Sequence, residues 1–283
     1  MFGNLNEIQI NVLIASIIGD GELTKLYKNS RRRNSSYREH YGENQKEYRE
    51  WKVQIMDGLF YIRPKSHTLC SASSPFFTNL LKLFYNETGK KTIPPSLLPN
   101  CKHPSFLAVL FMDDGTLSIT SKVNHNKKRI YLTPHIYLYL QNYFYEDLLI
   151  LKNHIKNQFN LDLHFGYRND GSGIILRTTS VKETFAYLDV INDATVSCPS
   201  MFYKTNWNFR LKLEEDKWGR NFPNYTFLVT SSERNKNYSI EEIKKLISLK
   251  NNGKTDKEIA LTLSRSYWSI VYKLRELRKD GIF

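Results

Sequence analysis

Two apolar stretches that end in Asp-Gly decide the fold of this chain. They read VLIASIIGDG at residues 12–21 and LAVLFMDDG at residues 107–115. Asp20 and Asp114 are 94 positions apart (114 minus 20). An apolar run that ends in Asp-Gly predicts a helix followed by a turn, because glycine readily adopts the conformation that closes a helix. Two such runs in one chain indicate an internal repeat.

The same order of predicted elements follows each stretch, so each half reads helix-strand-strand-helix-strand-strand-helix. After Asp20 we expect strands near 22–28 and 35–41, a helix near 44–60, extended residues near 62–73 and a helix from Pro75. After Asp114 we expect strands near 116–123 and 129–141, a helix near 144–159, strands near 161–168 and 173–179, and a helix near 181–192. The turn Asn169-Asp170-Gly171 separates the last two strands.

The tail from Tyr238 to Lys279 has a different pattern, which predicts three short helices. Capping boxes, in which Ser239 faces Glu242 and Thr255 faces Glu258, open the first two. The third helix follows a short turn, which is helix-turn-helix spacing, and Trp268, Ile270 and Leu274 are expected to pack its core. We therefore divide the chain into a first half (1–100), a second half (101–216), a linker (217–237) and a helix-turn-helix domain (238–283).

The charge of the chain predicts a polyanionic partner. The 283 residues carry a net charge of +13 and an isoelectric point near 9.5. Lysine and arginine side chains near phosphates release condensed counterions, so nucleic acid is the simplest partner. The alternative is a basic, solvated surface that keeps the protein dispersed. No apolar run approaches the roughly 20 residues of a membrane span.

Three widely spaced cysteines, with no CxxC pair, argue against a zinc site and for reduced thiols. No secretory signal is visible at the N-terminus. We expect a protein that is not secreted and that works in the cytoplasm of a bacterium or phage host, or in an organellar matrix.

The two Asp-Gly helix ends are a candidate metal site. A helix C-terminus carries partial negative charge, so a carboxylate there is repelled unless a cation binds. Small residues, Ala15, Ser16 and Gly19 in one run and Ala108 in the other, would let two helices pack side by side. Their carboxylates would then converge on a hard cation such as Mg²⁺. A single Asp-Gly is more simply a helix stop, but two copies in matching contexts favour the metal site.

At this point the residues resemble a known family. LAVLFMDDG resembles the LAGLIDADG motif of homing endonucleases, and residues 13–21 resemble a weaker copy with Ile18 in place of an acid. KKTIP at 90–94, YLYLQNYF at 137–144 and PSMFYK at 199–204 resemble the single-chain, intron-encoded branch of that family. The resemblance covers about residues 8–212.

The resemblance implies a role for each matching residue. The last acid before each glycine, Asp20 and Asp114, would bind Mg²⁺ or another divalent ion such as Mn²⁺. The residues before them, Gly19 and Asp113, are included in the metal site, although Asp113 is not the matching ligand. The following side chains match the catalytic lysines and water-ordering polar residues, with the histidine the weaker match because an ordinary strand histidine is an equal alternative: Lys91, Lys204, Gln141 and His40.

The family also implies an α+β fold with two pseudo-symmetric αββαββα halves, whose antiparallel sheets form a saddle over the DNA major groove, plus the small all-α domain here. Alternation along strands would put Thr24, Leu26 and Lys28 on one face, and Tyr37, Glu39 and Tyr41 on another. The candidate DNA contacts on the sheets and their loops are Lys28, Arg31, Arg32, Arg33, Tyr37, Arg38, Lys122, Arg129, Arg168 and Arg177. The candidates at the start of the third tail helix are Arg265, Ser266, Tyr267 and Ser269.

The resulting prediction is a monomeric, Mg²⁺-dependent homing endonuclease that cuts both strands of a long double-stranded DNA target. Two alternatives remain. One is an RNA maturase that assists splicing of its host intron, and the other is a DNA-binding regulator without catalysis. The presence of both aspartates and both lysines favours cleavage, because a protein that only binds nucleic acid does not need them.

Overall fold

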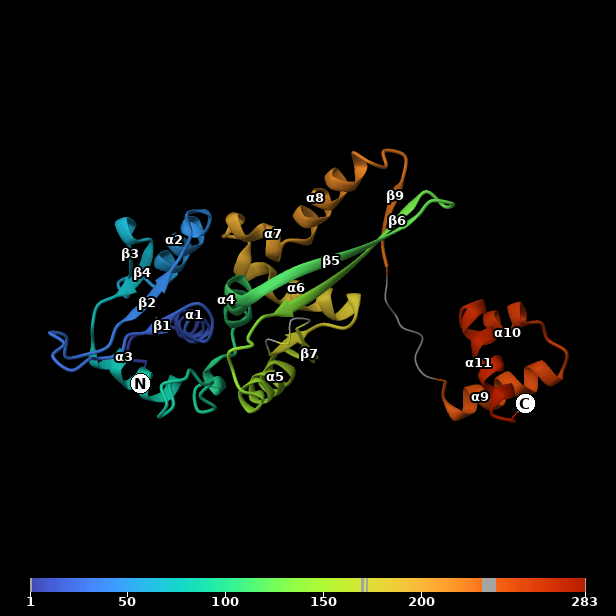
Figure 1. Ribbon diagram of the computed structural model, residues 1–283, viewed down its shortest axis with the longest axis horizontal. Helices are drawn as coiled ribbons and strands as arrows, with labels where there is room; N and C mark the ends of the chain where they lie inside the picture. The colour runs from blue at the N-terminus through green and yellow to red at the C-terminus, as the bar shows by residue number, and fades with distance from the viewer. Residues whose placement is uncertain (1, 169–170, 172, 231–237, 283) are drawn as a thin grey trace. The chain divides into compact units, whose positions relative to one another are not determined.

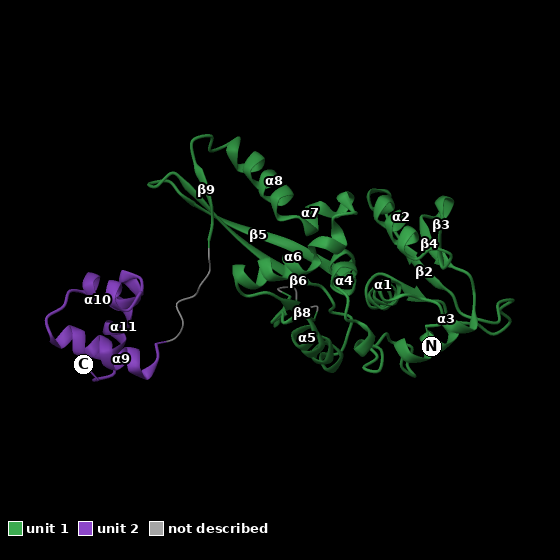
Figure 2. Cartoon of the chain, turned by 180° about the vertical axis from the view of Figure 1, so that it is seen from behind, with its two compact units in different colours: residues 1–232 green, residues 233–283 purple. Residues whose placement is uncertain are grey.

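The computed structural model describes residues 2–168, 171, 173–230 and 238–282. The chain divides into two compact units, unit 1 (Met1–Ser232) and unit 2 (Glu233–Phe283), coloured separately in Figure 2. Unit 1 contains both Asp-Gly stretches and both sheets. The regular elements that the structure describes in unit 2, between residues 238 and 282, are all helices.

Unit 1 begins with the first of two similar halves. A capping box starts its first helix: the side chains of Asn6 and Gln9 each accept a hydrogen bond from the other's backbone N–H. The elements of the first half are α1 (Glu7–Ile18), β1 (Glu22–Leu23), β2 (Tyr37–His40), α2 (Lys46–Ile55), β3 (Phe60–Arg63), β4 (Thr68–Ser71) and α3 (Pro75–Phe84).

The second half repeats this order with longer elements. They are α4 (Ser105–Asp114), β5 (Gly115–Asn124), β6 (Arg129–Leu138), α5 (Tyr145–Phe159), β7 (His164–Tyr167), β8 (Ile174–Arg177) and α6 (Val181–Thr195). The predicted turn at 169–171 lies largely outside the described residues. Both halves follow the predicted helix-strand-strand-helix-strand-strand-helix order, which confirms the internal repeat.

The two sheets have the same topology. The strand order is β1-β2-β4-β3 in the first half and β5-β6-β8-β7 in the second, and all these neighbours are antiparallel. This confirms the predicted α+β class with antiparallel sheets. The first sheet is much smaller than predicted, because the chain leaves β1 after Leu23 and returns at Tyr37. Residues 24–36 are mostly a loop, so the predicted shared face of Thr24, Leu26 and Lys28 does not form.

The two motif helices, α1 and α4, lie side by side in the middle of unit 1 (Figure 1). Side chains from Val12 to Ile18 and from Ser105 to Asp113 are buried. The helix ends approach so closely that a Cβ built on Gly19 would lie 2.6 Å from Oδ2 of Asp113. Glycine is therefore needed at this position, and the close packing predicted from the small residues is confirmed.

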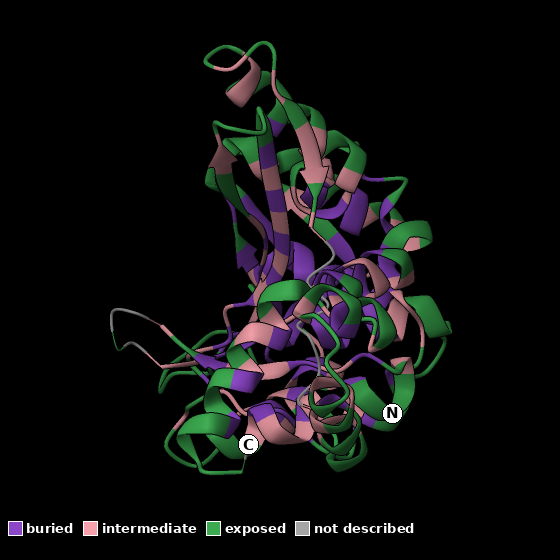
Figure 3. Ribbon diagram, turned by 90° about the vertical axis from the view of Figure 1, so that its right-hand side faces the viewer, coloured by how far each residue is buried: buried purple, intermediate pink, exposed green. Residues whose placement is uncertain are grey.

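The helices bury one face of the second sheet and leave its other face partly exposed, whereas all four residues of β4 in the first sheet are buried. Along β6 the side chains alternate between buried and partly exposed, and this banding is visible on the long strands in Figure 3. Such alternation is typical of a sheet with one covered face. The open face of the second sheet is therefore available to a partner.

Two helices and a strand follow α6 in unit 1. These are α7 (Phe202–Thr205), α8 (Trp207–Gly219) and β9 (Thr226–Val229), and β9 pairs in parallel with β6. The predicted linker at 217–237 therefore begins inside α8 and includes a paired strand. Residues 231–237 of that range lie outside the described residues.

Unit 2 consists of helices α9 (Ile240–Asn251), α10 (Asp256–Thr262) and α11 (Tyr267–Lys279). Both predicted capping boxes form. Its separate core contains Leu246, Ile259, Ala260, Ile270, Leu274 and Leu277. Within the described ranges of the two units, no helix is long and apolar enough to cross a membrane.

Candidate active site

The two motif carboxylates lie at the adjoining ends of α1 and α4. Asp20 follows Gly19, which ends α1, and Asp114 is the last residue of α4. Asp20 is exposed and Asp114 is partly exposed, whereas the neighbouring Asp113 is buried. Asp20 and Asp114 therefore lie within electrostatic reach of each other at one end of the helix pair.

The electrostatics of this pair are unfavourable without a cation. Burial, together with the nearby carboxylates of Asp113 and Asp20, raises the pKa of Asp114 to about 8. Burial and the charge of Asp113 also raise the pKa of Asp20, although Lys52 and Arg49 oppose that shift. Two carboxylates that repel each other in a partly buried place are stabilised by a bound cation.

One lysine from each half holds the backbone of a motif. Lys91 Nζ donates hydrogen bonds to the carbonyl oxygens of Gly19 at 2.9 Å and Gly21 at 2.8 Å. Lys204 Nζ donates to those of Met112 at 2.7 Å and Asp113 at 3.4 Å. These two matching arrangements reflect the pseudo-symmetry of the halves.

The same two lysines have perturbed electrostatics. Burial lowers the pKa of each, and the surrounding aspartates oppose the shift. Both lysines therefore lie within electrostatic reach of Asp20 and Asp114. Perturbed lysines beside paired acids are typical of catalytic sites.

A buried ion network lies beneath the carboxylate pair and joins the two halves. Lys52 Nζ lies 3.0 Å from Glu39 Oε1 and 2.9 Å from Asp113 Oδ1, and all three side chains are fully buried. The Tyr48 hydroxyl donates to Asp113 at 2.7 Å. Arg49 contacts Glu39 at 2.6 Å and Asp20 at 2.8 Å. The first half thus supplies the cations that neutralise an acid of the second half.

The same network contains Asp113, which the sequence included in the metal site. Carboxylate oxygens of Asp20, Glu39 and Asp113 all lie within 4.8 Å of one another, a spacing that suits a cation. However, the carboxylates of Glu39 and Asp113 both already accept hydrogen bonds from Lys52, and both residues are buried. Asp113 is therefore part of the structural network. Asp20, which is exposed, and Asp114, which is partly exposed, remain the candidate hard-oxygen donors for a divalent ion.

The network was not anticipated from the sequence. Strand alternation predicts only that Glu39 shares a face with Tyr37 and Tyr41, and it predicts no function for Glu39. The available signals were an acid on the buried face of a strand and two cations, Arg49 and Lys52, three residues apart on one helix. Neither signal identifies a partner that lies in the other half of the chain.

The predicted polar residues of the two halves have different surroundings. His40 is exposed and lines a hollow of about 510 Å³ together with Asp20 and Asp113. Gln141 is partly buried, and its side-chain oxygen has no hydrogen-bond partner within the described part of the chain. A polar atom without a partner is costly unless water or a ligand satisfies it.

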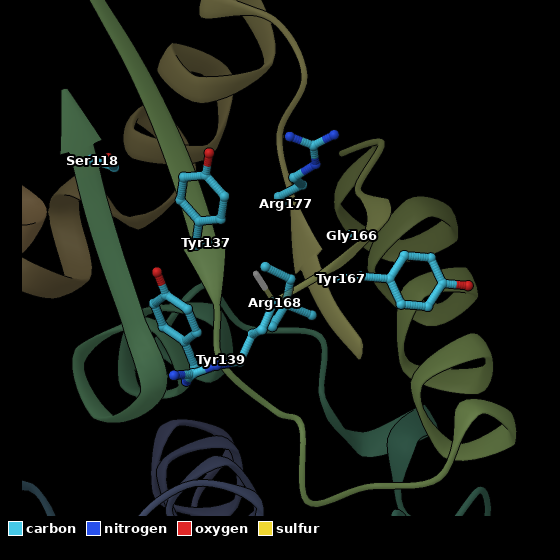
Figure 4. A pocket seen from close by; sticks show the side chains of 8 residues that line it. Ser118, Tyr137, Tyr139, Gly166, Tyr167, Arg168 and Arg177 are labelled. Carbon is cyan, nitrogen blue, oxygen red and sulfur yellow. The ribbon is translucent and has the colours of Figure 1, made fainter. Parts of the chain in front are cut away.

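The open face of the second sheet contains a hollow of about 620 Å³ (Figure 4). Tyr137 on β6 and Tyr139, just after the end of β6, stack with ring centroids 6.2 Å apart, and the Arg168 guanidinium lies 5.5 Å from the Tyr139 ring. Arg177 on β8 pairs with Tyr137 across the sheet. The structure thus brings together the two predicted arginines, Arg168 and Arg177. It also places beside them Tyr137 and Tyr139, which the sequence did not predict as DNA contacts.

The other predicted DNA contacts on unit 1 divide into exposed and buried side chains. Tyr37 is fully buried, stacks on Phe60 and donates its hydroxyl to Glu39, so its selection as a DNA contact was wrong. Arg38, on the opposite face of β2, is exposed and paired with Glu22. The remaining basic residues, which are all exposed, are Lys28, Arg31, Arg32, Arg33, Lys122 and Arg129.

Unit 2 also requires corrections. The Arg265 side chain is only 7% exposed because its guanidinium forms a double contact with Glu242. Ser266 caps α11, and Ser269 contacts the Tyr238 hydroxyl. Trp268, predicted to pack the core, is 63% exposed.

The rest of α11 agrees better with the sequence. Ile270 and Leu274 are buried as predicted, and Tyr267 is exposed. The exposed side of α11 carries Trp268, Tyr272, Arg275 and Lys279, which are spaced so that they share one helix face. We call these four residues the α11 stripe.

Two motif helices with a carboxylate at each adjoining end, between two antiparallel sheets, define the fold class of LAGLIDADG nucleases. A family model described as the LAGLIDADG DNA endonuclease family matches residues 10–184. The chain therefore belongs to this family.

Individual relatives agree with this assignment. The chain is 26% identical over 216 residues to "Probable intron-encoded endonuclease 1" of Wickerhamomyces canadensis, covering 72% of this chain and 86% of that protein. Among solved structures, "The homing endonuclease I-WcaI bound to its DNA recognition sequence" has a TM-score of 0.53 and 25% identity, covering 71% of this chain and 87% of that one.

Other relatives match over less of their own length. The chain is 26% identical over 212 residues to "Protein RecA" of Mycobacterium shimoidei, covering 73% of this chain and 48% of that protein. It is 29% identical over 123 residues to "Protein RecA" of Mycolicibacterium flavescens, covering 42% of this chain and 28% of that protein. The chain thus spans less than half of these RecA proteins.

Proposed function

We propose that this protein is a divalent-metal-dependent homing endonuclease that cuts both strands of a specific double-stranded DNA site. The observation that carries the proposal is the meeting of α1 and α4, where Asp20 and Asp114 lie within electrostatic reach of Lys91 and Lys204. Membership of the LAGLIDADG DNA endonuclease family and similarity to the DNA-bound I-WcaI support it.

In the proposed mechanism, each half acts on one DNA strand. Asp20 and Asp114 hold Mg²⁺ or a similar ion through hard oxygen donors. When bound, such ions lower the pKa of water and stabilise the charge on the leaving oxygen. Lys91 and Lys204 keep the two motif ends in place and offset the negative charge that develops on the phosphate. Gln141 and His40 order water beside the scissile phosphates, and the products are breaks with short 3′ overhangs.

The open sheet faces are the proposed DNA-binding surfaces. Arg168 and Arg177 lie beside the tyrosine pair on the second sheet, where arginine forks suit guanine edges or phosphates. The exposed cations of the loop after β1 and of the β5–β6 hairpin, such as Lys28 and Lys122, would contact the backbone. Because one chain contains both halves, we propose that it acts as a monomer on a long, imperfectly palindromic site.

We also propose that unit 2 is a helix-turn-helix domain that makes a second DNA contact. Its three capped helices and separate core support this assignment. We propose that the α11 stripe, and not Arg265, Ser266 and Ser269, contacts the DNA. Its aromatic side chains, near the start of the helix, suit apolar contacts with thymine methyl groups, and its two cations suit phosphates.

The proposal is tested by selection and cleavage. A plasmid library with long randomised inserts is incubated with the full chain and Mg²⁺, and the cleaved plasmids are captured and sequenced to identify the site. Asp20→Asn and Asp114→Asn should each abolish double-strand cleavage of that site and retain DNA binding. Addition of EDTA should stop cleavage by the unaltered protein.

The matched control is Asp57→Asn, which neutralises an exposed acid that follows α2. It should cut at the normal rate. Recovery of no cleaved plasmid with any divalent ion, or undiminished cutting by either motif variant, would contradict the proposed function.

A further inference from the structure

The two motif carboxylates have unequal surroundings, and Arg49 is the cause. Arg49 Nη2 donates to Asp20 Oδ2 at 2.8 Å. Its side chain is fully buried, it contacts Glu39 at 2.6 Å, and its guanidinium carbon lies 4.7 Å from the Tyr48 ring centroid. Because Arg49 is itself held by Glu39 and Tyr48, it fixes the Asp20 carboxylate in one orientation. It also offsets part of the negative charge of Asp20.

Asp114 has no corresponding cation. Among the residues that the structure describes, no hydrogen bond or ion pair is made to its carboxylate. Helix α5 occupies the place in the second half that α2 occupies in the first. Its two lysines, Lys152 and Lys156, both pair with Asp162, at 3.7 Å and 3.0 Å. The asymmetry therefore lies in where the cations of the two helices point: Arg49 contacts a motif carboxylate, and the lysines of α5 pair with Asp162.

Two opposite effects on metal binding follow from the Arg49–Asp20 pair. The guanidinium occupies one carboxylate oxygen and repels an incoming divalent ion, which weakens binding at Asp20. It also fixes the carboxylate, which favours the geometry needed for cleavage. Asp114 has no contacting cation that repels a metal ion, but it also lacks a side chain that orients it.

We propose that Arg49 is a positioning residue that makes the two carboxylates unequal ligands, so that the two DNA strands are cut with different metal requirements. This inference rests on the proposed nuclease function and adds an order in which the two DNA strands are cut. The strand served by Asp20 needs more metal, and the strand served by Asp114 is cut first when metal is scarce.

The test uses Arg49→Met in the full chain, with the selected DNA site labelled on one strand at a time. Cleavage of each strand is followed over a range of Mg²⁺ concentrations. For one strand only, the Mg²⁺ concentration at half-maximal rate should fall about fivefold, because a nearby positive charge has been removed. The maximal rate for that strand should also fall about tenfold, because the carboxylate is no longer held.

A second measurement does not depend on cleavage. Calorimetric titration of the free protein with Mn²⁺ should show tighter binding to Arg49→Met than to the unaltered protein by a similar factor. Arg49→Lys keeps the charge but not the fork of donors, so it should retain the original metal requirement while losing part of the maximal rate.

Lys152→Met is the matched control, because it removes a cation from the corresponding helix α5 where that cation is paired with Asp162. It should leave both strands unchanged. Equal loss on both strands in Arg49→Met, or identical Mn²⁺ titrations, would overturn the role of Arg49 while leaving the nuclease assignment intact. If the unaltered protein cuts no DNA, the proposed function itself fails.

Discussion

The ammonium group of Lys52 lies 2.9 Å and 3.0 Å from the two carboxylate oxygens of Asp113. Lys52 belongs to α2 in the first half, and Asp113 belongs to α4 in the second. The two halves are therefore joined by a buried ion pair as well as by the apolar contact between α1 and α4. Because Asp114 follows Asp113 directly, this pair also fixes the position of a proposed metal ligand.

Lys52→Met should lower the free energy of unfolding by about 3–5 kcal/mol, because it leaves Glu39 and Asp113 as buried charges without their main partner. Urea denaturation followed by fluorescence measures the change. Lys46→Met is the control, since Lys46 forms only an exposed pair with Glu50 at 3.8 Å, and it should cost less than about 1 kcal/mol. Equal losses in the two variants would show that the network contributes no more than a surface pair.

The sequence predicted the motif helices and the order of elements because both depend on local patterns. Apolar runs, Asp-Gly ends and capping residues such as Ser239 act over a few neighbouring positions. The carboxylate pair could be anticipated because an internal repeat implies pseudo-symmetry. Asp20 and Asp114 therefore meet as expected, and Lys91 and Lys204 lie at matching places.

The errors arose where a partner lies far away in the sequence. Asp113 forms an ion pair with Lys52, 61 positions earlier, and Arg265 forms one with Glu242, 23 positions earlier. Tyr37 was assigned to DNA because strand alternation shows which side chains share a face but not which face is covered. Trp268 was assigned to a core because it is large and apolar, although its helix position faces solvent.

Asp114→Asn should stabilise the metal-free protein near neutral pH. The pKa of Asp114 is raised from 3.8 to about 8, so between these values the folded chain keeps a proton that the unfolded chain releases. Stability due to this group therefore falls as pH rises from about 4 to about 8 and is constant above that. Asparagine does not titrate and removes this loss.

Thermal and urea unfolding in EDTA measure the effect of Asp114→Asn. The gain should reach about 1–3 kcal/mol near neutral pH and shrink as the pH approaches about 4. Asp57→Asn, at an exposed position, should show no such pH-dependent gain. A constant difference at every pH would mean that the proton on Asp114 is not responsible.

Lys91→Met and Lys204→Met should each slow cleavage about 100- to 1,000-fold with little change in DNA affinity, because each removes a preorganised cation from the site of charge development. Single-turnover cleavage and equilibrium binding to the selected DNA site separate the two effects. Lys90→Met is the neighbouring control: Lys90 is exposed, and its ammonium lies 3.5 Å from the Phe144 ring centroid. A similar rate loss in all three variants would point to a general effect of charge.

The α11 stripe can be tested through the salt dependence of binding by the full chain. Arg275→Ala should reduce the slope of log affinity against log salt by about 1, because one phosphate contact is lost. Trp268→Ala should weaken binding several-fold without changing that slope, since an apolar contact releases no counterions.

Arg265→Ala breaks the pair with Glu242, so it should lower the stability of unit 2 and leave the slope unchanged. Lys244→Ala, an exposed charge on α9, controls for net charge. If Lys244→Ala changes the slope as much as Arg275→Ala, cations spread over unit 2 would account for binding and the stripe would have no special role.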